Sequence, residues 1–109
     1  MKTKRGYAVG SGNVFADIGL PGAEERQRKS ELARQIGRIL SDRGLTQIAA
    51  GRLLGIDQPK VSRLIRGQLA EFSTDRLLKF LNDLGADVEI RLKVKRHAKS
   101  RGHTQVVQA

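Results

Sequence analysis

Cysteine and tryptophan are absent from the sequence, and aromatic residues are scarce, with three Phe and one Tyr in 109 residues. Without cysteine the chain can form neither a disulfide scaffold nor a thiolate zinc site, and it has no cysteine nucleophile. The few aromatic side chains are scattered, which argues against a base-stacking platform for single-stranded RNA. No apolar run approaches the ~18 residues of a membrane-spanning helix. We therefore expect a soluble, cytoplasmic protein without a membrane partner.

The residue patterns of enzymes, cofactor sites and metal sites are also missing. The Gly-Ser-Gly run at 10–12 is followed neither by Gly-Lys-Ser/Thr nor by a third glycine in place, so it is neither a phosphate loop nor a dinucleotide-binding loop. Glu24 and Glu25 fit the first turn of a helix better than a catalytic pair. His97 and His103 have no neighbouring ligands in the sequence. We predict no catalytic residue, no metal site and no cofactor.

Acidic residues are the scarcer charged type, because 11 Asp and Glu stand against 21 Lys and Arg, and the net charge is +10. Such an excess favours polyanionic partners. By itself it does not choose between DNA, RNA, anionic lipid and an acidic protein, so the local pattern must decide.

The length suits one small domain with short tails. Residues 1–20 are predicted to form a flexible basic arm with a short apolar patch, and residues 96–109 a disordered basic tail. Between them we predict a helical domain over 21–86, because apolar residues recur there at spacings of three and four. The predicted helices lie within 22–43, 46–55, 58–66 and 73–85.

Two of these helices, joined by the turn at 55–57, have the arrangement of a helix-turn-helix. Thr46 is the predicted N-cap of the first helix. Gly51 allows close approach of the second helix, where Val61 and Leu64 are expected to fix the crossing. An ordinary hairpin in a core is the alternative, but the exposed face of the second helix carries side chains suited to base edges and phosphates. These are Gln58, Lys60, Ser62, Arg63 and Arg66.

The hydrophobic period changes after the last helix. Val88, Ile90, Leu92 and Val94 alternate with charged residues, which predicts a strand over 87–95 with one apolar face. An isolated strand of this kind needs a partner, and the same strand of a second copy is the simplest one. We therefore predict a homodimer joined by a two-stranded sheet. The basic residues of the strand and tail either contact phosphates or protect the strand edge from aggregation.

The segment 54–67, Leu-Gly-Ile-Asp-Gln-Pro-Lys-Val-Ser-Arg-Leu-Ile-Arg-Gly, together with Thr46-Gln47, resembles the XRE family of helix-turn-helix proteins, the lambda-repressor and Cro-like group. The similarity extends over about 32–84. The resemblance implies a mainly α fold, a lambda-repressor-like helical bundle. The strand over 87–95 would add pairing across a dimer.

The resemblance also implies roles for individual residues. Gln47, at the start of the first helix, would bond a phosphate together with the helix N-terminus. Gln58, Lys60 and, one turn further on, Arg63 would contact bases. Arg66 would reach the DNA backbone.

Pro59 departs from the family pattern. It stands where many relatives have a polar residue, so an apolar contact, to a thymine methyl, would replace a polar one. Because proline disfavours the helical conformation of the residue before it, Gln58 is a candidate for the N-cap itself. The full predicted DNA-binding set is Thr46, Gln47, Gln58, Pro59, Lys60, Ser62, Arg63 and Arg66.

We expect a dimeric, sequence-specific DNA-binding transcription regulator that represses from its own operator. A narrower resemblance, carried by residues 13–20 and 85–90, is to small HigA-like antitoxins of toxin-antitoxin systems, which implies a cognate toxin as a further partner. Two alternatives stay open. One is an RNA-binding or ribosome-associated basic protein, and the other is a toxin-neutralising module without operator preference.

Overall fold

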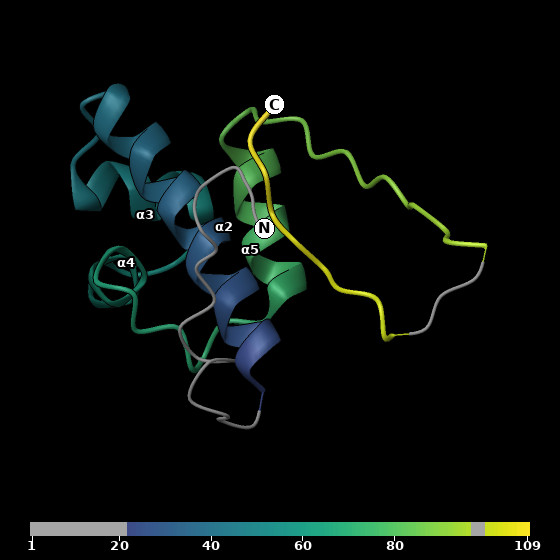
Figure 1. The fold of residues 1–109 in the computed structure, drawn as a ribbon. Helices are drawn as coiled ribbons and strands as arrows, with labels where there is room; N and C mark the ends of the chain where they lie inside the picture. Colours follow the sequence, from purple (N-terminus) through teal and green to yellow (C-terminus); the bar gives the residue numbers. More distant parts are fainter. Residues whose placement is uncertain (1–21, 97–99) are drawn as a thin grey trace.

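The structure is a computed structural model that describes residues 22–96 and 100–109, and four helices lie within them (Figure 1). The helices are α2 (Ala23–Asp42), α3 (Gln47–Leu54), α4 (Gln58–Ile65) and α5 (Thr74–Asp83). Each lies within a predicted segment, so the mainly helical fold is confirmed. The predicted basic arm, residues 1–20, lies outside the described residues. Of the helices that are described, none combines the length and the apolar content that crossing a membrane requires.

Three of the helices begin at a side chain that accepts a hydrogen bond from the backbone N–H three residues further on. Thr46 begins α3 in this way at 3.1 Å, Asp57 begins α4 at 2.9 Å and Ser73 begins α5 at 3.1 Å. Each cap satisfies an N–H that has no partner inside the helix and contributes about 1 kcal/mol to stability. The predicted N-cap at Thr46 is confirmed.

The start of α4 differs from one expectation. Gln58 is the first helical residue rather than the N-cap, because the Asp57 carboxylate accepts the backbone N–H of Lys60. Pro59 follows Gln58 inside the first turn, where its missing N–H would have had no helical partner. The hydrogen bond from the Lys60 N–H to the Asp57 carboxylate therefore caps α4, and Gln58 is helical although a proline follows it.

The core lies between α2, α4 and α5, with α3 packed against α4. Ile36 of α2 and Leu77 of α5 are fully buried, and the rings of Phe72 and Phe80 meet edge to face with centroids 5.9 Å apart. From α4, the fully buried side chain is Val61, joined by Leu64 at 1% exposure. Since these two residues hold the inner face of α4 against the core, its outer face is left to solvent.

The chain after α5 leaves the helices as an extended segment and comes back toward α2 (Figure 1). Residues 87–95 contain neither helix nor strand in this single chain. The four apolar side chains of the predicted strand are all exposed, from 38% at Val88 to 91% at Val94. The alternation in the sequence therefore gives no buried face within one copy, and the pairing across a dimer stays a prediction.

The last residues of the chain contact α2, although they form no helix or strand over 100–109. His103 Nδ1 lies 2.9 Å from a carboxylate oxygen of Glu24, and Arg38 donates a hydrogen bond to the side chain of Gln108. Val106 packs partly buried against the core. The described part of the tail thus meets α2 through two side chains and the core through a third, and its predicted disorder stays a prediction.

Candidate nucleic-acid interface

The α3–α4 pair is built around a close backbone approach at Gly51. A Cβ at this position would lie 2.6 Å from the carbonyl oxygen of Ile56 and 3.5 Å from Cγ2 of Val61. The Gly51 carbonyl in turn accepts the N–H of Gly55 at 2.8 Å and that of Ile56 at 3.0 Å. Gly55 has φ +72°, a left-handed conformation that glycine adopts without steric cost. The predicted close approach at Gly51 is confirmed, because this position leaves no room for a side chain between α3, the turn and Val61 of α4.

The first turns of α3 and α4 are linked by a side-chain hydrogen bond. Nε2 of Gln58 donates to Oε1 of Gln47 at 2.7 Å. Gln47 keeps both of its own amide N–H groups, and Gln58 keeps its carbonyl oxygen for another partner. The two glutamines that the resemblance places on a phosphate and on a base are therefore held side by side.

The remaining predicted side chains lie on or beside the outer face of α4. Gln58, Pro59 and Arg66 are exposed, and Lys60, Ser62 and Arg63 are partly exposed. Thr46 is exposed at the start of α3, where its hydroxyl accepts the capping hydrogen bond. The predicted DNA-binding residues, all on or next to α3 and α4, are thus at least partly open to solvent, whereas the predicted dimerisation residues lie on the extended segment beyond α5.

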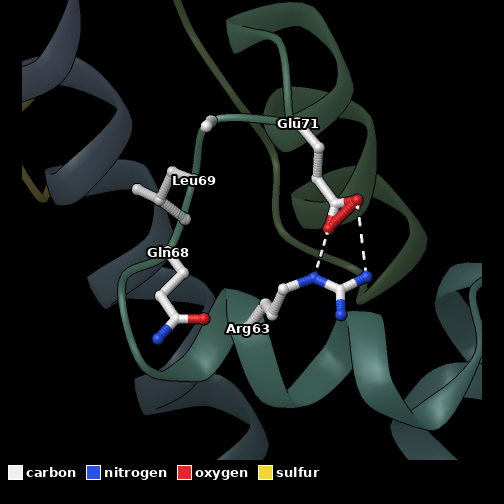
Figure 2. Close-up of a pocket in the computed structure, with 5 residues that line it drawn as sticks. Arg63, Gln68, Leu69 and Glu71 are labelled. Carbon is white, nitrogen blue, oxygen red and sulfur yellow. Dashed lines mark hydrogen bonds and ion pairs between the residues drawn. The ribbon is translucent and has the colours of Figure 1, made fainter.

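Arg63 forms an ion pair that the sequence pattern does not predict. Its Nε donates to Oε1 of Glu71 at 2.6 Å, and its Nη2 lies 3.5 Å from Oε2 of the same carboxylate (Figure 2). The hydrogen bond from Arg63 lowers the pKa of Glu71, and the hydrogen bond to Glu71 raises the pKa of Arg63. Both groups therefore stay charged at neutral pH. No local pattern marks this pair, because its members are eight residues apart across the end of a helix.

A shallow pocket lies beside this ion pair. Its lining consists of Arg63, Gln68, Leu69, Ala70 and Glu71 (Figure 2). Within the described part of the chain, no group of three His, Asp or Glu residues is placed to hold a metal ion. The predicted DNA-binding residues of α3 and α4 therefore offer hydrogen-bond donors and cations that face solvent.

Two short helices, a glycine turn between them and a solvent-facing second helix define the helix-turn-helix class. The helix-turn-helix domain family matches residues 14–93 of the chain. A solved structure named "Putative XRE Family Transcriptional Regulator" is 43% identical and has a TM-score of 0.75, and the match covers 82% of this chain and 100% of that chain. Curated protein sequences give no significant match. The chain therefore belongs to the helix-turn-helix family, and within it to the XRE type.

Proposed function

We propose that the protein is a transcription regulator that binds a specific double-stranded DNA operator and represses from it. The observation that carries this proposal is the hydrogen bond that holds Gln47 of α3 beside Gln58 at the start of α4, a helix whose Lys60 and Arg63 side chains are partly exposed. Amide and guanidinium groups are the side chains that form paired hydrogen bonds with adenine and guanine in the major groove. The family membership of the chain supports the same class of function.

In the proposed complex α4 is the recognition helix and enters the major groove. Gln47 donates its free amide N–H groups to a phosphate at the N-terminal end of α3. Gln58 and Lys60 contact base edges from the first turn of α4, and Arg63 contacts a base one turn further on. Pro59 offers an apolar surface to a thymine methyl group.

The other predicted residues have supporting roles in this proposal. Arg66, the C-cap residue of α4, reaches the DNA backbone. Ser62 and Thr46 lie next to the recognition surface and donate hydroxyl hydrogen bonds to phosphates or bases.

The proposed regulator acts as a homodimer joined through residues 87–95. Ile90, Leu92 and Val94 are 75%, 84% and 91% exposed in the single chain, which is unusual for consecutive alternate apolar residues. Pairing the two copies in one antiparallel sheet would bring these side chains into cross-strand contact and give hydrogen-bond partners to the backbone groups along one edge of the segment. The two recognition helices would then meet successive major grooves about 34 Å apart.

The experiment is to select a binding site from a random duplex library and measure affinities by fluorescence anisotropy at ~150 mM salt. We expect the full chain to bind the selected duplex at least ~10³-fold more tightly than random duplex. Lys60→Ala should reduce this preference, whereas Lys79→Ala, which removes an exposed cation of α5, should not. Equal affinity for every duplex would refute the proposal, and tighter binding to structured RNA would favour the RNA-binding alternative.

A toxin-neutralising role is the narrower part of the proposal, and the resemblance carried by residues 13–20 and 85–90 supports it. Residues 13–20 lie outside the described residues. A small toxin reading frame next to the gene, whose growth arrest is relieved by coexpression of this chain, would be the expected outcome. Operator binding without any such neighbour would leave a stand-alone regulator.

A further inference from the structure

The ion pair between Arg63 and Glu71 joins the recognition surface to the loop that connects α4 with α5. Glu71 lies in this loop between Leu69, which is buried at 8% exposure, and Phe72, which is buried at 1%. The N–H of Phe72 donates to the carbonyl of Leu69 at 3.0 Å, and the N–H of Gln68 donates to the carbonyl of Arg63 at 2.9 Å. The backbone that carries the Glu71 carboxylate is therefore anchored to the core on both sides.

The geometry of the pair uses one edge of the guanidinium group and leaves another. Nε and Nη2 of Arg63 donate to the Glu71 carboxylate, while Nη1 takes no part in the pair and points away from the carboxylate (Figure 2). A guanidinium group has five N–H donors in a planar fork, so the edge formed by Nη1 and the second N–H of Nη2 can still donate two parallel hydrogen bonds. Guanine presents two acceptors, O6 and N7, that such an edge fits.

Holding Arg63 in this way has two physical consequences. A free arginine side chain loses much rotamer freedom when it forms a paired contact, and an arginine already fixed by Glu71 has lost that freedom before DNA arrives. The carboxylate also offsets the positive charge of Arg63, which weakens its attraction to phosphates of any sequence. Side chains that are 41% and 37% exposed keep the pair accessible to a duplex.

We propose that Glu71 is a positioning residue that orients Arg63 toward one guanine of the operator and so sets sequence preference at that base pair. The inference rests on the proposed function, since it assigns a role within the same recognition surface. Glu71 itself contacts Arg63 and not the base. It raises affinity for duplexes that carry this guanine and does not raise affinity for random duplex.

The test is a double-mutant cycle with Arg63→Ala, Glu71→Gln and the double variant, measured on the selected operator, on operators altered at each G·C pair, and on random duplex. Arg63→Ala should abolish the preference at one guanine, a loss of about 5- to 150-fold for one paired contact. Glu71→Gln should lower affinity at that same base pair about 3- to 10-fold, a fraction of the full contact. The affinity of Glu71→Gln for random duplex should be unchanged or higher. The double variant should have the same affinities as Arg63→Ala.

A matched control removes a different exposed acid from an ion pair. Asp83 accepts Lys79 Nζ at 3.1 Å on α5, and Asp83→Asn should leave base preference unchanged. The free protein gives an independent measurement: the Arg63 Nε–H resonance should be protected from solvent exchange in the wild type and lose that protection in Glu71→Gln.

Equal tightening on operator and random duplex would mean that Glu71 only repels DNA, and an undiminished Glu71→Gln loss in the Arg63→Ala background would mean that it acts elsewhere. Either result would refute the positioning role of Glu71 and leave the proposed regulator function unaffected. If the wild type binds every duplex alike, the proposed function and the positioning role both fall.

Discussion

Replacing Gly51 with alanine tests whether the helix-turn-helix depends on the close approach of α3 to the turn. The new Cβ would lie 2.6 Å from the carbonyl oxygen of Ile56, a separation that real Cβ atoms essentially never show. Because that oxygen belongs to the backbone of the turn, the clash cannot be relieved by moving a flexible side chain. Either the turn or the α3–α4 crossing has to shift.

The net effect of this substitution follows from two opposing contributions. Overpacking a tight contact costs about 1–3 kcal/mol. Alanine in place of glycine inside a helix returns up to about 1 kcal/mol. We expect Gly51→Ala to lower the free energy of unfolding by about 1–2 kcal/mol, since the clash is with the backbone. At roughly 4–8 °C per kcal/mol, Tm falls by about 4–16 °C.

Gly37 supplies the matched control. It also lies inside a helix, α2, but a Cβ there would meet no atom of the described residues within 4 Å. Gly37→Ala should therefore gain only the helix propensity, about 0.5–1 kcal/mol, and raise Tm. Thermal unfolding followed by far-UV circular dichroism measures both variants. If the two substitutions raise Tm alike, the backbone contact at Gly51 does not limit the side chain at this position.

Three further predictions concern the helix cap, the ion pair and the dimer. Asp57→Ala should lower the free energy of unfolding, measured by thermal unfolding, by about 1 kcal/mol. Asp57→Asn should lower it much less because asparagine also caps helices. Equal losses in the two variants would assign the effect to charge. The pKa of Glu71 is lowered in the folded state, so the stability that the pair contributes is present above the ordinary value of 4.5 and is lost as pH falls through the folded pKa. Tm of the wild type should thus fall more steeply below that pH than Tm of Glu71→Gln, and parallel curves would contradict this. Ile90→Asp should give monomers by light scattering and weaken operator binding, whereas Arg91→Asp, at an alternate position of the same segment, should stay dimeric; a dimeric Ile90→Asp would exclude pairing through this segment.

Local chemistry explains why the helices could be predicted from the sequence. Thr46 and Ser73 cap helices by bonds to an N–H three residues away, and Gly55 ends α3 because it adopts a left-handed conformation. Such features depend only on neighbours in the sequence. The start of α4 was not predicted correctly: the restriction before Pro59 suggested Gln58 as the N-cap, whereas in the folded chain the Asp57 carboxylate caps this helix.

Contacts between distant residues account for what the sequence did not predict. Arg63 meets Glu71 only because burial of Leu69 and Phe72 sets the course of the loop between them. Gln108 reaches Arg38 across 70 residues, and Val106 packs on the core from a segment with no hydrophobic period. Periodicity and capping rules describe neighbours along the chain, so they carry no information about these pairs.

The net charge of +10 has different consequences in different parts of the molecule. Cations on exposed segments attract any polyanion, and this attraction is screened by salt and carries no sequence information. On the recognition surface two pairs act differently: Gln47 fixes Gln58, and Glu71 fixes Arg63 while offsetting its charge. Glu71 weakens the attraction of Arg63 to phosphates of any sequence but leaves Arg63 able to form paired hydrogen bonds. The binding energy that Arg63 still contributes therefore depends on the base that it meets, which favours discrimination between sequences. In the proposed regulator, excess charge speeds the encounter with DNA, and these two side-chain pairs select the site together with Pro59 and Lys60.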